Sequence, residues 1–257
     1  MTDQSAGYIL TLEAPAGPLS ARNLEDYLLC PRKYLLSYFV ARGQSVRHIG
    51  GPAMVARAVR AALVEGYSAL APGSPEPYSL DRLIAAFEEH WDGRVCADAL
   101  EEQNLHRDAL RMLQTHWEQP LPLGEGAHTD LRLEAEVAGH PMVAVADVAS
   151  EAPPRVVRFT TSRRPPSPGK LTSDLSLGLL WLLGAQRLGP ATGGLLVDLR
   201  QGRVMQYALD DAAAAALEAR IADIASRIRR ERDFPPYKGK PCHWCRSRAD
   251  CPAWGHE

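Results

Sequence analysis

The chain has 257 residues, 46% of them hydrophobic and 23% charged, which is enough apolar material for a substantial core and excludes wholesale disorder. Its formal net charge of −2 excludes a strongly basic nucleic-acid binder on the global count but not a local basic patch. The first residues carry Asp3 and Glu13 and no basic segment, so we expect no signal peptide, no membrane contact and a cytoplasmic protein.

The first half of the chain is expected to be mostly helical. Tyr8–Leu12 favours a short strand, and Ser20 is typical of an N-cap residue for a helix that runs to about Val40. Three further helices are expected over residues 52–70, 79–91 and 96–118. Proline and glycine crowd residues 71–78 and 120–126, so both segments are expected to be loops.

The second half alternates strands with helices. Strands are expected over residues 131–137, 141–149, 156–161, 193–199 and 203–209, and helices over 171–188 and 210–233. Gly139–His140 and Gln201–Gly202 predict hairpin turns. This order favours an α/β fold with a central mixed β-sheet flanked by helices. We expect one domain over residues 1–257, with a helical insertion at about 71–130 and a cysteine-rich tail at 234–257.

Four of the five cysteines fall in two places, at Cys30 and in a tail trio formed by Cys242, Cys245 and Cys251. A Cys-x2-Cys spacing lets two thiolates ligate one metal centre. Closing the loop of more than two hundred residues between Cys30 and the tail trio costs about 5 kcal/mol, and a structural metal site can return roughly 10–16 kcal/mol. The residues leave open zinc held by the tail trio with His243, although Cys-Pro pairs at both ends are typical of iron–sulfur ligands. The fifth cysteine, Cys96, is expected to be a buried structural thiol.

The two ends of the chain carry motifs of one family. Leu24–Leu36, which reads LEDYLLCPRKYLL, closely resembles the opening of the RecB-like branch of the PD-(D/E)XK nucleases, and Phe234–Pro252 resembles its closing cysteine motif. The resemblance covers nearly the whole chain and is weak over 71–130. It implies a restriction-endonuclease-like core. Because AddB-type helicase-nucleases and related CRISPR-associated exonucleases hold a [4Fe–4S] cluster this way, it also implies that cluster on Cys30, Cys242, Cys245 and Cys251.

The active-site pattern of that family is broken here. Asp147 matches the first acid, but Arg158 and Thr160 replace the acid-x-Lys pair on the next strand. Positions two apart on a strand share a face, so both replacements would face the metal. At about 4 Å and an effective dielectric near 20, Arg158 would repel a divalent ion by about 8 kcal/mol. None of the chain's four lysines has an acid two residues before it, so no acid-x-Lys pair exists elsewhere.

The other family positions have changed as well. Val55 stands where the family has a histidine, and Ser176 and Leu180 replace its Gln-x3-Tyr pair. Asp147 and Glu134, on neighbouring strands of one predicted hairpin, could bind a metal weakly, but we favour a relict acid and a surface carboxylate. Magnesium or manganese is therefore not expected. The chain also lacks the Gly-x4-Gly-Lys-Ser/Thr loop of an ATPase.

Basic residues gather near the predicted active-site strand and in the tail. From Ser226 to the end there are eight Lys or Arg against four acids, which suits phosphate contacts and equally suits a solvated helix face. The resemblance favours DNA. The candidate contacts are Arg158, Arg163, Arg164, Arg230, Lys238, Lys240 and Trp244.

These observations support three hypotheses. The first, which we favour, is a pseudo-enzyme with an iron–sulfur cluster. It would bind single-stranded DNA or DNA ends, or support a helicase or nuclease partner in trans, in DNA repair, recombination or defence. The second is an active metal-dependent DNA exonuclease that uses Asp147. The third is a purely structural protein-interaction subunit with no affinity for DNA.

Overall fold

The computed structural model describes residues 17–40, 50–69, 78–122 and 127–254. Its centre is a six-stranded mixed sheet in which the strands follow the order β1-β3-β4-β5-β6 and β2 also pairs with β3. The strands are β1 (Leu19–Ser20), β2 (His128–Val137), β3 (His140–Glu151), β4 (Pro154–Thr160), β5 (Gly193–Asp198) and β6 (Arg203–Tyr207). The expected mixed sheet is therefore confirmed.

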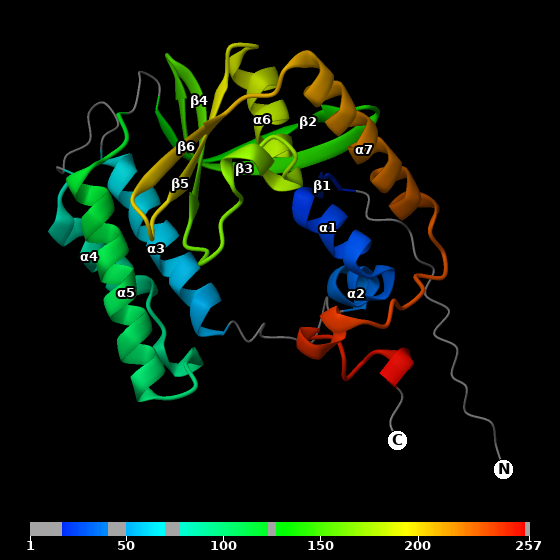
Figure 1. The fold of residues 1–257 in the computed structure, drawn as a ribbon, viewed down its shortest axis with the longest axis horizontal. Helices are drawn as coiled ribbons and strands as arrows, with labels where there is room; N and C mark the ends of the chain where they lie inside the picture. The colour runs from blue at the N-terminus through cyan, green and yellow to red at the C-terminus, as the bar shows by residue number, and fades with distance from the viewer. Residues whose placement is uncertain (1–16, 41–49, 70–77, 123–126, 255–257) are drawn as a thin grey trace.

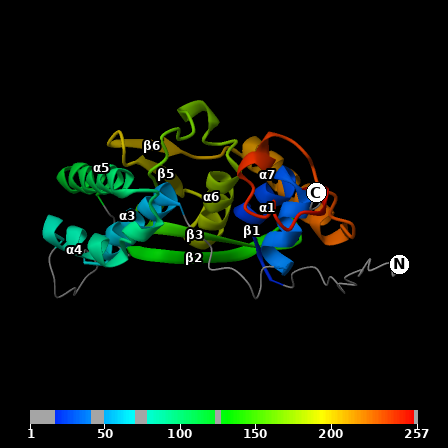
Figure 2. The ribbon, with the colours of Figure 1, turned by 90° about the horizontal axis from the view of Figure 1, so that it is seen from below.

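Helices cover both faces of this sheet. They are α1 (Ala21–Leu29), α2 (Pro31–Leu35), α3 (Gly51–Ser68), α4 (Leu80–His90), α5 (Ala99–Glu118), α6 (Leu175–Leu188) and α7 (Asp211–Arg230). Buried residues of α1, α6 and α7 form one hydrophobic core with the sheet. Those of α3, α4 and α5 form a second core, which includes Val157 and Phe159 of β4. Both views place α4 and α5 at one end of the molecule and α1 with the tail at the other (Figures 1 and 2).

Side-chain caps explain where several helices begin. Ser79 accepts a hydrogen bond from the Arg82 amide and starts α4, as expected. Asp98 caps α5, so this helix begins at Ala99 and not at Cys96. Asp174 caps α6 in the same way, so the expected start of this helix at Leu171 was four residues early.

The first expected helix is divided at Cys30. Ser20 is the expected N-cap of α1 and also forms a capping box with Asn23, but the single helix predicted to run from Ser20 to about Val40 was wrong. Cys30 is extended, with φ −169° and ψ 114°, and Pro31 opens α2 as its first residue. A proline lacks the N–H that would continue α1 and disfavours helical geometry in the residue before it. A π-helical turn over Leu36–Val40 follows α2.

The turn between β2 and β3 lies one residue earlier than expected. Ala138 and Gly139 occupy it with φ values of 47° and 79°, and His140 already pairs with Val137 as the first residue of β3. Two consecutive positive φ values give the turn a twist that matches the two flanking strands. The predicted Gly139–His140 turn was therefore off by one position.

Some expectations lie beyond what the structure addresses. The expected strand at Tyr8–Leu12 and most of the loop at 71–78 fall outside the described residues. The division of the chain into one domain with an insertion and a tail stays a prediction. Among the described helices, none combines the length and the apolar character needed to cross a bilayer.

A buried tyrosine–histidine pair in the second core leads to a pH-dependent prediction. Tyr67 Oη lies 2.7 Å from His116 Nε2 and accepts a hydrogen bond from the Leu121 amide at 2.9 Å. Burial lowers the pKa of His116 to about 4. The unfolded chain binds this proton near pH 6.5. The contribution of neutral His116 to the free energy of unfolding is therefore fully present above pH 6.5 and is lost as the pH falls towards 4, by roughly 3 kcal/mol in all.

Urea unfolding of the protein between pH 7 and 4 measures this loss, and a His116→Gln variant serves as its control. The variant lacks the titrating ring, so its free energy of unfolding should depend less steeply on pH across this interval. Equal slopes for the two proteins would show that His116 does not supply the effect.

Candidate functional site

Asp147 lies where the sheet opens between two strands. The β3–β4 ladder ends at the Val148–Val157 pair, and β3 pairs with β1 further along, at Met142 and Val143. Asp147 stands at this fork with an exposed fraction of 0%. The sequence predicts Asp147 at the end of the run Val143–Asp147, but β3 continues to Glu151, so Asp147 lies inside the strand. At the fork its carboxylate can bond across the gap.

An arginine side chain and a backbone amide bind the Asp147 carboxylate. Arg60 Nε of α3 lies 2.5 Å from Oδ1, and the Phe159 amide donates to Oδ2 at 2.7 Å. Arg60 also pairs with Asp130, at the start of β2. Burial alone would lower the pKa of Arg60, but the charges of Asp147 and Asp130 outweigh burial and raise it. Arg60 is therefore a permanent cation held against the buried acid.

A second guanidinium group stands on the other side of Asp147. Arg158 Nε lies 3.9 Å from Oδ2, and Arg158 Nη2 donates to the Val145 carbonyl at 2.7 Å, across the gap between β3 and β4. Arg158 therefore lies beside Asp147, on the strand where the sequence places it. Thr160 accepts a hydrogen bond from the Ser162 amide, so its hydroxyl is engaged in the loop that follows β4.

The other acid and histidine positions do not converge on this site. Glu134 is exposed, pairs with Arg132 and lies opposite Val143 in the β2–β3 ladder. Since Val143 is four residues from Asp147, the two acids are roughly 13 Å apart along the sheet. Val55 is buried in the core that α3 forms with the sheet.

No sequence motif marks Arg60 or Asp130, the two partners that the structure adds. A signal was nevertheless present, because α3 is rich in alanine and valine and Arg60 is one of its three charged residues, with Arg57 and Glu65. A charged residue in a helix that must pack on a sheet needs a counter-ion, and buried charges are almost always paired. The identity of that counter-ion depends on how α3 crosses the sheet.

The second candidate site is a pocket at the opposite end of the molecule from α4 and α5. Cys30, Cys242, Cys245 and Cys251 all line this one pocket, which has a volume of about 50 Å³. The Tyr237 amide donates to Cys30 Sγ at 3.3 Å, and Cys242 Sγ donates to the Tyr237 carbonyl at 3.6 Å. All four cysteines are free thiols. The structure thus brings together the four cysteines that the sequence singled out.

The spacing within this pocket is not that of an assembled single-ion site. Across the described ranges, no three His, Cys, Asp or Glu side chains are grouped closely enough to hold one metal ion.

Cys96 lies apart from the pocket, half-buried against the second core, where burial raises the pKa of its thiol. It is therefore less buried than expected.

The ends of the chain are also joined by contacts that need no metal. Tyr27 Oη donates to Glu231 Oε2 at 3.1 Å, and Arg32 Nη2 donates to the Asp233 carbonyl at 3.2 Å. Phe234 is buried beside Tyr34, with ring centroids 6.1 Å apart and an interplanar angle of 15°. These contacts hold residues 231–234 against α1 and α2, and so they bring the tail to Cys30 (Figure 1).

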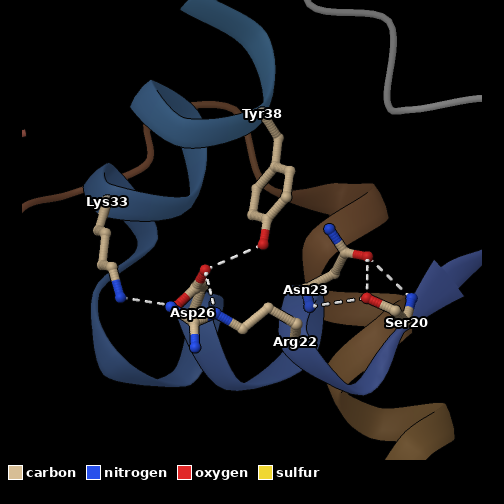
Figure 3. A network of polar contacts seen from close by, with 6 residues as sticks. All are labelled: Ser20, Arg22, Asn23, Asp26, Lys33 and Tyr38. Atoms are coloured by element: carbon tan, nitrogen blue, oxygen red, sulfur yellow. Dashed lines mark hydrogen bonds and ion pairs between the residues drawn. The ribbon is translucent and has the colours of Figure 1, made fainter. Parts of the chain in front are cut away.

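A polar network fixes the helix break that carries Cys30. Asp26, at the end of α1, accepts hydrogen bonds from Lys33 Nζ at 2.6 Å, Tyr38 Oη at 2.9 Å and Arg22 Nε at 3.1 Å (Figure 3). Burial alone would raise the pKa of Asp26, but the bond from Lys33 and the charge of Arg22 outweigh it and lower this pKa. The ionised carboxylate therefore ties α1 to the segment that follows Cys30.

The expected nucleic-acid contacts fall into separate groups. Arg163 and Arg164 are exposed in the loop after β4, and Arg158 is engaged at Asp147. In the tail, Lys238 and Trp244 line the cysteine pocket. Arg230 and Lys240 are exposed nearby in the chain but do not line it. The structure brings only part of the predicted set together.

Exposed aromatic rings accompany the tail cations. Trp244 has an exposed fraction of 69%, and Tyr237 and Trp254 are also exposed. The Lys238 ammonium lies 5.3 Å, and the Arg248 guanidinium 4.3 Å, from the centre of the Trp254 ring. The cysteine pocket is thus rimmed by large aromatic side chains and positive charge, and we call residues 237–254 the tail surface.

Comparisons with known proteins agree with this architecture. The family model described as the PD-(D/E)XK nuclease superfamily matches residues 18–252. A crystal structure of a protein from Eubacterium rectale named "Putative exonuclease" is 13% identical and has a TM-score of 0.52, with coverage of 96% of this chain and 93% of that one. At this identity the likeness supports the fold alone.

A second solved structure, that of SSO0001, is 17% identical and has a TM-score of 0.32, with coverage of 91% of this chain and 96% of that one. No curated protein matches the chain. The family model nevertheless spans both candidate sites and every strand of the sheet. This chain belongs to the PD-(D/E)XK nuclease superfamily.

Proposed function

We propose that this protein is a RecB-like member of the superfamily that binds DNA without cutting it. One observation supports the proposed loss of cleavage. The buried Asp147 carboxylate lies 2.5 Å from Arg60 and 3.9 Å from Arg158, so arginine stands where a nuclease needs a divalent cation. A metal-dependent nuclease uses such a cation to polarise the phosphate and to lower the pKa of the attacking water.

Electrostatics supports this interpretation. Each guanidinium group repels a divalent ion at about 4 Å by about 8 kcal/mol at an effective dielectric near 20. An arginine cannot lose its proton to relieve this repulsion. The chain has no acid-x-Lys pair that could restore the second acid and the lysine.

We further propose that the four pocket cysteines hold a [4Fe–4S] cluster. The shared pocket, the free thiols and the amide that already donates to Cys30 Sγ support this assignment. Iron–sulfur clusters are held by four thiolates and are tuned by hydrogen bonds to their sulfurs. Such a cluster would fasten the tail surface to α1 and α2.

The tail surface is the proposed DNA-binding element. Lysine side chains neutralise phosphates, and exposed aromatic rings stack on unpaired bases, a combination typical of proteins that bind single strands. Lys238 and Trp244 offer both kinds of contact on one rim. A helicase or nuclease partner would then act in trans on the bound strand, in DNA repair, recombination or defence.

A paired lysine substitution tests the tail surface. Lys238→Ala/Lys240→Ala should weaken binding to a labelled single-stranded oligonucleotide and should lower the slope of log K against log salt by about 1.4, because each lost phosphate contact removes about 0.7. Fluorescence anisotropy over a salt series measures both quantities, and a duplex of the same sequence compares the two DNA forms.

The matched control is Arg107→Ala/Arg111→Ala, which removes the same charge from exposed positions on α5, at the other end of the molecule. This control should bind as the wild type does. Degradation of either DNA with manganese or magnesium, abolished by Asp147→Ala, would instead identify an active nuclease. Binding too weak to detect, together with a co-purifying protein, would identify an interaction subunit.

A further inference from the structure

Arg32 is the second residue of α2 and lines the cysteine pocket. One arm of its guanidinium group is engaged, because Nη2 donates to the Asp233 carbonyl at 3.2 Å. Its Nε is buried, and within the described part of the chain it has no hydrogen-bond partner. A permanently charged group therefore presents one buried and unsatisfied N–H at the edge of the cysteine pocket.

An unsatisfied buried donor costs about 1–3 kcal/mol, and more when the donor is charged. This cost disappears if the pocket contains an acceptor. The four cysteine sulfurs are among the acceptors that line the pocket, and thiolates that ligate a cluster carry negative charge. A guanidinium N–H next to such sulfurs would both satisfy its own hydrogen bond and offset their charge.

The other cations that line the pocket already have partners. Lys33 Nζ donates to the Asp26 carboxylate at 2.6 Å. Lys238 and Arg248 face the ring of Trp254, at 5.3 Å and 4.3 Å from its centre. Among these four side chains, Arg32 is the one that the structure leaves with a buried and unbonded N–H.

We infer that Arg32 is a positioning residue for the cluster, and that its Nε–H would donate a hydrogen bond to a cluster sulfur. This inference rests on the proposed cluster. Hydrogen bonds to the sulfurs and nearby positive charge stabilise the more negative, reduced form of a cluster and so raise its reduction potential. Arg32 would thus set the potential and slow the loss of iron.

Arg32→Met tests the inference, because methionine keeps much of the side-chain length and removes the charge and the N–H. The anaerobically purified variant should have a lower reduction potential, measured by a dye-mediated titration followed by electron paramagnetic resonance. It should also release iron to a ferrous chelator about 10- to 100-fold faster than the wild type, the range typical of lost outer contacts to a metal site.

Arg32→Lys retains the positive charge without the planar donor, so its potential should lie between those of the methionine variant and the wild type. Arg246→Met is the matched control, because Arg246 is exposed between two ligand cysteines and does not line the pocket. Its potential should remain close to that of the wild type. If Arg32→Met fails to retain a cluster, the lysine variant supplies the measurement.

The possible failures are distinguishable. A wild-type protein without iron and sulfide, or one loaded with zinc, would overturn the proposed cluster and this inference with it. A cluster whose potential is unchanged in both Arg32 variants would overturn the inference alone. If the reduction potential shifts equally in Arg246→Met, the shift in Arg32→Met comes from the general loss of positive charge. That result would also contradict the assigned hydrogen bond.

Discussion

Asp147→Asn should destabilise the protein by roughly 3 kcal/mol at pH 7. The substitution leaves Arg60 and Arg158 facing a neutral amide in a fully buried position, and removing one partner of a buried ion pair costs roughly 3–5 kcal/mol. We expect the lower end of this range because the Arg60 side chain keeps an exposed fraction of 36% and is partly screened by water. Urea unfolding measures the change.

The sign of this change separates two kinds of site. An acid of a metal-binding site, studied without its metal, stands among like charges, so its neutralisation tends to stabilise the fold. An acid that serves as the counter-ion of arginine behaves in the opposite way. A stabilised Asp147→Asn variant would therefore contradict our description of this site.

Asp130→Asn provides the matched control, since Asp130 pairs with the same Arg60 but has an exposed side-chain fraction of 52%. An exposed pair contributes about 0–1 kcal/mol, so this variant should differ little from the wild type. The double variant Asp147→Asn/Arg60→Met should recover part of the loss, because replacing both partners of a buried pair costs less than replacing one. Strictly additive effects would show that the two side chains do not interact.

Cys30→Ser should abolish the iron and sulfide content of the protein and loosen its tail. Four thiolates hold such a cluster, and in the proposed site Cys30 would be the ligand that joins the tail to α1 and α2. Loss of a link that closes so long a loop costs roughly 5 kcal/mol by the chain-entropy estimate. Limited trypsin digestion should then cut faster after Lys238, Arg246 and Arg248, and iron analysis with an absorbance spectrum should report the cluster.

The sheet and both cores should survive this change. Tyr27–Glu231 and Arg32–Asp233 hold the start of the tail without a metal, and Phe234 is buried beside Tyr34. Trypsin cleavage should therefore be confined to residues 237–254. The control is Cys96→Ser, which should keep its iron, because this thiol lies outside the pocket. Full iron content in Cys30→Ser would exclude that residue as a ligand.

The sequence was most informative where local rules decide the structure. Ser79, Asp210 and the strand alternation after Leu131 predicted helix starts and strands to within a few residues, because caps and side-chain alternation depend on near neighbours. The errors have local causes as well. Pro31 divides the first helix, and Asp174 moves the start of α6.

The two candidate sites also differ in how far local sequence predicts them. The four cysteines could be grouped from motifs alone, and the structure places them on one pocket. The partner of Asp147 could not be predicted, because Arg60 is far away in the chain and meets the acid only through the way α3 packs on the sheet. For the same reason, Glu134 is not close to Asp147 although they lie on paired strands, since register sets their separation.

Direct measurement of manganese binding tests the central claim most simply. Manganese added to the protein should give the electron paramagnetic resonance signal of the free ion at every concentration of protein, because Arg60 and Arg158 already neutralise Asp147. Loss of that signal on titration with the wild type, and its return with Asp147→Asn, would mean that the carboxylate holds a metal and that the proposed loss of cleavage is wrong.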